Sequence, residues 1–222
     1  MSGMSFAQLS QLLLQGTLDT LYMTLVSTAI AYLIGIPLGV ILVITRRDGI
    51  CPAPKTNAVL GTIVNIMRSV PFLILIIVLI PFTRLVAGTS IGATATIVPL
   101  IVGAAPFIAR MVESSLLEVD AGVVEAAQAM GASPWQIVTK VLLKESVPSL
   151  VTGAAIALTT ILGYSAMAGA VGGGGLGDLA IKYGYHRYQT DVLLLTLIIL
   201  VLLVQVIQAL GNAVAKRIDH RK

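Results

Sequence analysis

Charged residues are scarce in this chain of 222 residues. They make up 11% of the sequence, whereas hydrophobic residues make up 57% and the mean hydropathy is +0.97. About a quarter of the residues of a typical soluble domain are charged. The composition therefore indicates a polytopic membrane protein, and it leaves no tract long enough for a soluble domain.

The residues that build covalent and metal sites are also few. Cys51 is the single cysteine, which excludes an internal disulfide framework. No cluster of His, Cys, Asp and Glu has metal-ligand spacing, so we expect no metal in this chain. No phosphate-binding G-x-x-x-x-G-K segment is present, so any ATP chemistry must belong to another chain.

The apolar residues gather into long runs. A membrane-spanning helix needs about 20 mostly apolar residues. Residues 1–16 contain no Lys or Arg, so they lack the basic start of a signal peptide and predict an amphipathic helix at the membrane interface. The expected fold is an all-α membrane protein with five transmembrane helices. The five stretches are 21–44, 58–82, 91–109, 149–171 and 191–213.

Positive charge is distributed unevenly over the connections. The loop 45–57, the segment 110–148 and the tail 216–222 together hold ten basic residues, and the connections on the other side hold three. Cytoplasmic loops of membrane proteins carry such an excess. We therefore expect the N-terminus outside and the C-terminus in the cytoplasm. The net charge of +4 then reflects topology, and no nucleic-acid partner is expected.

A polar, helical segment interrupts the apolar runs after the third stretch. Asp120 is a suitable N-cap for a helix over 121–130, and Gly131 is suited to end it. Ser133, Pro134 and Gln136 then have the spacing of a capping box with proline at the first helical position. The sequence predicts helix, tight turn, helix. The apolar face of the second helix is predicted to carry Trp135, Ile137, Val138, Val141 and Leu142.

Two interpretations of this hairpin remain open on these grounds. It could simply connect two spans, although connections between bundled helices commonly need only about 2 to 8 residues. It could instead contact another protein in water, because it is longer than a connection requires and carries charge.

The hairpin resembles a known motif. Glu125, Ala126 and Ala127, then three residues and Gly131, then nine residues before Val141-x-Leu143, resemble the EAA motif of ABC importer permeases. The family pattern runs E-A-A, three residues, G, nine residues, I-x-L-P, so Val141 replaces Ile and Lys144 replaces Pro.

Longer stretches resemble one branch of that family. GTSIG, VPLIVGAAPFIARMVESSLLEV, EAAQAMGASPWQIVTKVLL and GYSAMAGAVGGGGLG resemble the membrane subunit of methionine-importing ABC transporters. The resemblance extends from about residue 17 to 215 and implies an ABC transmembrane type-1 domain with the type I importer fold. The hairpin over 113–148 would be its coupling element.

The resemblance implies a role and partners. The chain would be a non-enzymatic permease of the bacterial inner membrane that imports methionine, including D-methionine, by alternating access. Its partners would be a second copy of itself, a cytoplasmic ABC ATPase dimer that binds ATP and Mg, and an extracytoplasmic methionine-binding protein. An ABC permease for another amino acid or small solute remains the alternative.

The resemblance also implies roles within the hairpin. Glu125, placed at a helix start, would order the turn or pair with an arginine of the ATPase. Ala126 and Ala127 would permit close approach, Gly131 would be the backbone pivot, and Ser133 and Pro134 would start the second helix.

The glycine run GGGGLG at 172–177 matches the dinucleotide-binding pattern G-x-G-x-x-G, but it follows an apolar span rather than a β-strand. We expect a flexible or tightly turned outer loop. Gly174, Gly175 and Gly177 serve either as a structural turn or as a contact for the binding protein.

Two other groups of residues are candidates for the transport pathway. In GYSAM, Tyr164, Ser165 and Met167 end the fourth stretch, and Met167 is either an apolar gate at the dimer axis or ordinary filling. Ser165 also suggests an intramembrane serine protease, which would need a histidine beside it.

Arg68 is a charge within a predicted span, with Asn65 one turn away. The pair would line the pathway or brace a helix broken at Pro71. Arg68 could equally extend toward the cytoplasm with no transport role.

Overall fold

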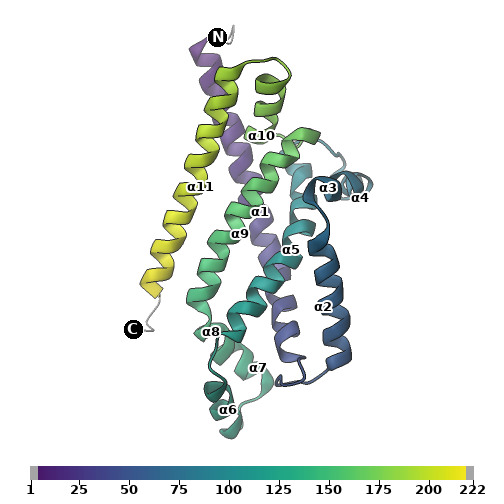
Figure 1. Cartoon of the computed structure of the whole chain (residues 1–222), viewed down its shortest axis with the longest axis vertical. Coiled ribbons are helices and arrows are strands. Elements are labelled where there is room, and N and C mark those ends of the chain that lie inside the picture. The colour runs from purple at the N-terminus through teal and green to yellow at the C-terminus, as the bar shows by residue number, and fades with distance from the viewer. Residues whose placement is uncertain (1–4, 219–222) are drawn as a thin grey trace. The chain divides into compact units, whose positions relative to one another are not determined.

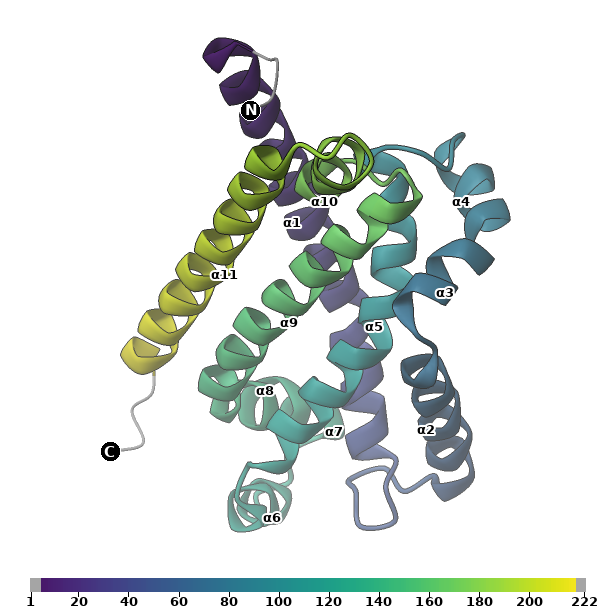
Figure 2. The same cartoon turned by 45° about the horizontal axis from the view of Figure 1, so that its top comes forward.

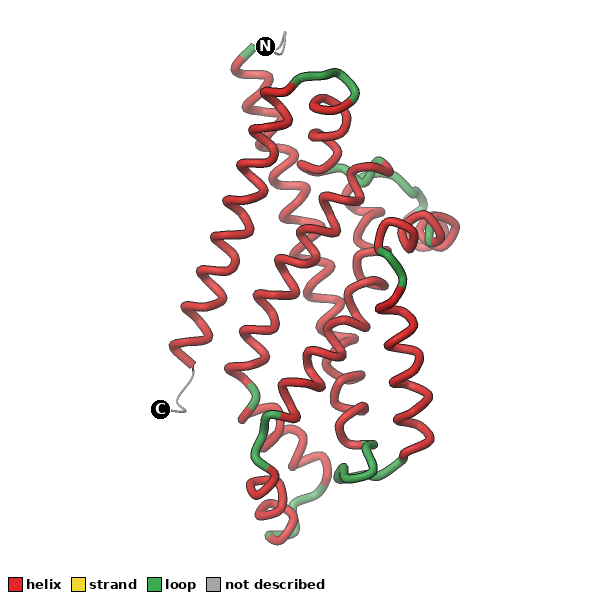
Figure 3. The backbone as a smooth tube through the Cα atoms, viewed as in Figure 1, coloured by secondary structure: helices red, strands yellow, loops and turns green. Residues whose placement is uncertain are grey.

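The computed structural model describes residues 5–218, and within that range the chain forms helices and loops without a strand (Figure 3). η1 and η3 are π-helices and η2 is a 3-10 helix. The predicted all-α class is confirmed. In chain order (Figure 1) the elements are α1 (Phe6–Ile44), α2 (Pro54–Ser69), α3 (Phe72–Val78), α4 (Ile80–Ala87), α5 (Ala93–Leu117), α6 (Ala121–Ala129), α7 (Pro134–Gln136), η1 (Ile137–Leu142), α8 (Leu143–Glu145), α9 (Val147–Ala168), η2 (Gly169–Val171), α10 (Gly175–Leu179), η3 (Ala180–Tyr185) and α11 (Thr190–Ile218).

Among the described residues, 5–218, four helical stretches are long and apolar enough to cross a membrane: Phe6–Ile44, Ala93–Leu117, Val147–Tyr185 and Thr190–Ile218. A fifth is obtained only if α2 and α3 count together as one broken span. The five apolar stretches of the sequence therefore correspond to these four helical stretches and to the pair α2 and α3, which is broken between Ser69 and Phe72.

The second apolar stretch differs most from the prediction. It was expected to span 58–82, but α2 ends at Ser69 and α3 begins at Phe72. Pro71 has no backbone N–H and takes a ψ of 130°, outside the helical region, and proline also disfavours helical geometry at the residue before it. The break at Pro71 that the sequence suggested is confirmed.

The beginning of the chain also differs from expectation. We expected an interfacial helix of its own over residues 1–16, but the helix that starts at Phe6 continues without interruption to Ile44. Residues 1–4 of that stretch lie outside the described residues. Of the expected tail 216–222, the part up to Ile218 is the end of α11, and the remainder lies outside the described residues.

The chain divides into two compact units, and α1, α5, α9 and α11 contribute to both. The first unit comprises Met1–Ile30, Val70–Ala104 and Ala157–Ala209, and the second comprises Ala31–Ser69, Ala105–Ile156 and Leu210–Lys222.

In the first unit, the segment between η2 and α10 packs against α1 and α5 (Figure 2). The backbone N–H of Leu176 donates to Thr20 Oγ1 over 2.9 Å, and Thr96 Oγ1 donates to the Gly173 carbonyl over 3.0 Å. These bonds satisfy buried polar groups and hold the glycine segment in place.

In the second unit, α1 and α5 pack closely through glycines. A Cβ atom added to Gly39 would lie 2.7 Å from the Ala109 carbonyl oxygen, so a larger residue there would push the helices apart. On α5, Ile108, Val112 and Leu116 recur every four residues and are 0%, 1% and 1% exposed. This stripe is part of the core that supports the hairpin.

Candidate functional site

The hairpin between α5 and α9 begins with α6, which has the predicted ends. Asp120 caps it by accepting a hydrogen bond from the Gly122 N–H over 2.7 Å. Gly131 follows the helix with a φ of +77°, and the Ala132 N–H donates back to the Ala127 carbonyl over 3.0 Å. This hydrogen bond closes the last turn of α6. It requires a residue in the left-handed conformation between its two ends, and Gly131 is that residue. The predicted helix and its glycine terminus are confirmed.

The second half of the hairpin starts with the predicted capping box. The Gln136 N–H donates to Ser133 Oγ over 3.4 Å, and the Ser133 N–H donates to Gln136 Oε1 over 2.8 Å. Pro134 occupies the first turn, where its missing N–H leaves no bond unmade. Local chemistry thus fixes both sides of the turn at Gly131.

Beyond Gln136 the second helix of the hairpin departs from regular α-helical geometry. α7 passes into the π-helix η1 and then into α8, which the sequence did not predict. Ile137, Val138 and Leu142 are buried, as the helical wheel predicted. Trp135 was expected on the same buried face, but it is 74% exposed.

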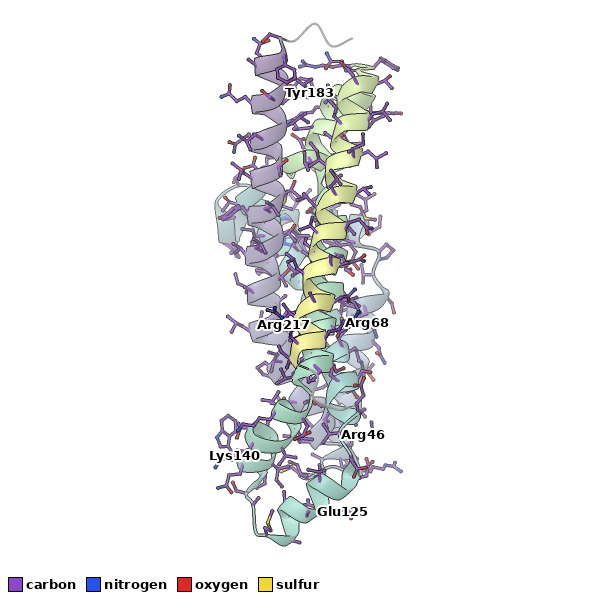
Figure 4. All side chains as sticks on the ribbon, turned by 90° about the vertical axis from the view of Figure 1, so that its left-hand side faces the viewer. Arg46, Arg68, Glu125, Lys140, Tyr183 and Arg217 are labelled. Atoms are coloured by element: carbon purple, nitrogen blue, oxygen red, sulfur yellow. The ribbon has the colours of Figure 1, made fainter. Side chains whose placement is uncertain are left out.

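Glu125 is the fifth residue of α6, so it does not lie at a helix start as expected. Its side chain is exposed and lines a cavity of about 320 Å³ together with Gln128, Arg46 and Asp48. Arg46 pairs with Asp48, with 3.3 Å between Nε and Oδ1. Figure 4 shows Arg46 and Glu125 in this part of the second unit. The hairpin thus presents an acidic group beside an existing ion pair.

Small and apolar residues surround Glu125 on the surface of α6. Ala127 is buried, whereas Ala126 is exposed and offers little steric resistance to an approaching chain. Val123 is 45% and Met130 82% exposed. Apolar exposure on a charged hairpin is typical of a protein-binding surface.

The glycine run forms a tight turn over 172–174 and then the first residues of α10, so it is not a loop throughout as predicted. Gly172, Gly174 and Gly175 all have positive φ values, of 80°, 79° and 72°. Gly175 and Gly177 are buried, and a Cβ on Gly177 would lie 2.3 Å from the Ala166 carbonyl oxygen. This packing supports the structural role and leaves those two glycines no surface for a binding protein.

Tyr164, Ser165 and Met167 face different surroundings. Tyr164 stacks on Phe72, and Met167 is 52% exposed. Ser165 is buried and its hydroxyl donates to the Leu162 carbonyl over 2.7 Å. The described histidine, His186, instead makes an edge contact with Tyr185, so residues 5–218 contain no Ser–His pair for a serine protease.

Asn65 and Arg68 are both exposed on α2. Figure 4 labels Arg68. The Asn65 carbonyl accepts a hydrogen bond from Ser69 Oγ over 2.9 Å, immediately before the break at Pro71. Within residues 5–218, no group of three or more His, Cys, Asp and Glu side chains could hold a metal ion.

Two partly buried ion pairs lie outside the motif residues. Arg110 pairs with Glu113, three residues later on α5, and it also donates to the Gly61 carbonyl of α2 over 2.9 Å. Asp178 pairs with Lys182 over 2.7 Å in the first unit and was not singled out from the sequence. The four-residue spacing of Asp178 and Lys182 was the available signal.

Comparison with known protein families identifies the family of this chain. Residues 35–222 match the family described as "Binding-protein-dependent transport system inner membrane component". The chain belongs to this family. It is therefore a multi-pass inner-membrane permease subunit of an ABC importer, and the family suggested by the EAA motif is confirmed.

Relatives within the family are similar over most of the chain. The probable D-methionine transport system permease protein MetI of Vibrio cholerae serotype O1 is 54% identical and covers 97% of this chain and 96% of its own length. The D-methionine transport system permease protein MetI of Escherichia coli K12 is 56% identical over 71% of this chain and 73% of its own.

Solved structures of transporter chains are also similar to this chain. A chain of the MetNI methionine ABC transporter in an inward-facing conformation matches with a TM-score of 0.95 and 51% identity, covering 98% of this chain and 100% of its own. An amino acid ABC transporter solved with histidines matches with a TM-score of 0.78, 18% identity and coverage of 95% and 96%, which shows the shared fold.

Proposed function

We propose that this permease carries methionine into the cell as a homodimer, driven by a pair of ABC ATPase chains that dock on the α6 hairpin. The observation that carries the proposal is the hairpin itself. It places Glu125, exposed alanines and apolar side chains on a helix fixed at both ends by Asp120 and Gly131.

The hairpin suits the transmission of force. α6 is capped at its start and closed at its end, so it moves as a rigid piece rather than fraying. Ala127 and the η1 residues Ile137 and Val138 are buried, which joins the hairpin to the body of the second unit. A pull on α6 is therefore passed to α5 and α9.

The proposed cycle is alternating access by rigid-body motion. Two ATPase chains that close on ATP bring together two hairpins, one from each permease chain. One hairpin per chain and two motors per complex imply a twofold-symmetric pair of permeases. In this arrangement the hairpin and the C-terminus lie in the cytoplasm and the N-terminus lies outside, in accordance with the distribution of basic residues.

Glu125 is the proposed ionic contact with the motor. It is exposed, and among residues 5–218 no ion pair involves it. An arginine of the ATPase that entered the cavity beside Gln128 would form a charge-assisted bond with its carboxylate. Arg46, which pairs with Asp48, would repel the positive charge of that arginine. It would thereby limit the direction from which the arginine can reach Glu125.

Methionine is supported as the solute by the similarity to the MetI proteins and the MetNI structure. Its side chain is neutral, so the pathway needs no dedicated charge. An external methionine-binding protein would select the solute and deliver it. A permease for another small amino acid is the alternative, and competition by unlabelled amino acids in an uptake assay separates the two.

The test of coupling uses two glycines with matched geometry. Gly131 and Gly88 have φ values of +77° and +75°, and a Cβ on either would meet no atom within 4 Å. Gly88 caps the end of α4 in the first unit. It is distant from the hairpin in the sequence, so it serves as the control. Replacing each by Asp imposes the same left-handed backbone on a non-glycine residue.

The readout is uptake of labelled methionine into proteoliposomes that contain the permease, its ATPase and ATP, with the binding protein outside. We expect Gly131→Asp to lose uptake while the ATPase alone still hydrolyses ATP, and Gly88→Asp to retain uptake. Equal uptake by the two variants would refute a coupling role for the hairpin turn.

A further inference from the structure

An apolar groove lies in the second unit between the end of α1 and the second half of the hairpin. Its volume is about 410 Å³, and apart from Thr139 its lining residues are hydrophobic or proline. α1 contributes Ile36, Val40 and Ile44, and the hairpin contributes Trp135, Val138 and Leu143.

The polar side chain in the wall is already satisfied. Thr139 lines the groove, but its hydroxyl donates to the Trp135 carbonyl over 2.7 Å. Apart from the Trp135 indole N–H and the acceptor lone pairs of Thr139, the groove side chains offer an occupant no hydrogen bond. A peptide or a sugar would lose its bonds to water on entering, whereas a hydrocarbon chain would lose none.

The groove continues the exposed apolar surface of α1. Leu33 is 75% exposed and Pro37, one turn later, is exposed and lines the groove. α1 is long and apolar enough to cross a membrane, and its last turns form one wall. The groove thus opens onto the side of a membrane span, near its end.

Residues at the rim are those of a membrane interface. Trp135 is 74% exposed, and tryptophan is enriched where the hydrocarbon meets the head groups. Lys140 and Lys144 directly follow the groove residues Thr139 and Leu143, and both are exposed. Figure 4 shows Lys140 at the edge of the hairpin, on the opposite side of that view from Arg46. The hairpin thus carries exposed positive charge at two positions that are adjacent in sequence to groove residues.

We infer that this groove binds an acyl chain of an anionic phospholipid, whose head group lies against Lys140 and Lys144. The apolar wall takes the chain, Trp135 packs along it, and the lysines attract the negative head group. The lipid fills the space between α1 and the hairpin, and so supports the hairpin at the membrane surface. The inference rests on the proposed topology, in which the hairpin lies beside the inner leaflet.

The chain contains a reporter for this site, because Trp135 is its single tryptophan. The full-length permease is placed in nanodiscs whose lipids carry bromine on their acyl chains, which quench indole fluorescence on contact. We expect brominated phosphatidylglycerol to remove a larger fraction of the Trp135 emission than brominated phosphatidylcholine. Iodide in the water should quench little.

Two sets of variants separate head-group from acyl-chain recognition. Lys140→Gln combined with Lys144→Gln should abolish the difference between the two lipids while quenching by both persists. Val40→Phe fills the groove and should reduce quenching by either lipid. Val59→Phe, at a 59% exposed position on α2 outside the groove, is the matched control and should change nothing.

Two results would overturn the inference. One is efficient quenching by iodide with none by brominated lipids, which would place Trp135 in water. The other is loss of lipid quenching when a tryptophan-free version of the ATPase binds, which would assign the groove to the motor. Neither readout depends on transport, so failure here is distinct from failure of the proposed function in the uptake assay.

Discussion

The rings of Phe72 and Tyr164 stack face to face, with centroids 4.5 Å apart and planes inclined by 5°. Phe72 is the first residue of α3, directly after the break at Pro71, and Tyr164 lies in α9. The contact belongs to the first unit. It fixes the start of α3 to a long helix and so determines how the chain continues after the break.

The first prediction concerns this stack. An aromatic pair contributes about 0.5 to 1.5 kcal/mol beyond the area it buries. We expect Tyr164→Leu to lower the free energy of unfolding by roughly that amount, and Tyr164→Phe to preserve it. Unfolding in SDS, with Phe72→Leu as the second arm of a double-mutant cycle, measures the coupling. Additive effects of the two substitutions would show that the stack contributes nothing.

The second prediction concerns the close packing of the glycine segment. Gly177→Ala would place a methyl group 2.3 Å from the Ala166 carbonyl oxygen, and backbone cannot rotate away as a side chain can. Overpacking of this kind costs about 1 to 3 kcal/mol, occasionally more.

The matched control is Gly163→Ala, because a Cβ at Gly163 meets nothing within 4 Å. Folded yield and the SDS unfolding midpoint should fall for Gly177→Ala but not for Gly163→Ala, because alanine inside a helix is at least as stable as glycine. Equal midpoints for the two variants contradict the packing described here.

The third prediction contrasts two ion pairs. The Arg110 and Glu113 side chains are 23% and 14% exposed, whereas those of Arg46 and Asp48 are 39% and 78% exposed. Breaking a fully buried pair costs about 3 to 5 kcal/mol, and an exposed pair contributes about 0 to 1.

We therefore expect Glu113→Gln to cost roughly 1 to 3 kcal/mol of unfolding free energy, because its pair is only partly screened from water. Asp48→Asn should cost less than about 1 kcal/mol, and its small effect should vanish in high salt. A larger loss from Asp48→Asn than from Glu113→Gln would contradict the burial difference.

The fourth prediction concerns the start of the second hairpin helix. Ser133→Ala removes the side-chain acceptor for the Gln136 N–H, and loss of an N-cap costs about 0.5 to 2 kcal/mol. If docking requires the ordered hairpin, affinity for the ATPase should fall by up to about an order of magnitude. Ser133→Asp keeps an acceptor and should bind as the wild type does. Titration of labelled ATPase onto the permease in nanodiscs measures both.

The start and end of α6 and the start of the second hairpin helix could be predicted from the sequence. Asp120, Gly131 and Ser133 each act on backbone groups within three or so positions, so the information that fixes them is local and is visible in the sequence. The same holds for the break at Pro71, which follows from the missing N–H of proline. The π-helical turn of η1 has no such local signature, and it was missed.

Other features depend on segments that are distant in the chain. Composition alone makes the glycine run look like an exposed loop, because nothing in it reveals that Thr20 and Ala166 lie against it. The exposure of Trp135 likewise depends on where α1 ends relative to the hairpin. Periodicity assigns a residue to a face of a helix, but it does not say whether another element covers that face.

The interruption between α2 and α3 has a consequence for how the chain can sit in lipid. Ser69, Val70 and Pro71 are all exposed on the isolated chain, and the helical hydrogen-bond ladder is discontinuous there. Hydrocarbon offers no partners for free backbone amides and carbonyls, so irregular backbone at membrane depth occurs only against protein or a water-filled passage. If α2 and α3 cross the membrane as one broken span, the face of these helices that carries the gap must therefore be turned away from the surrounding lipid tails.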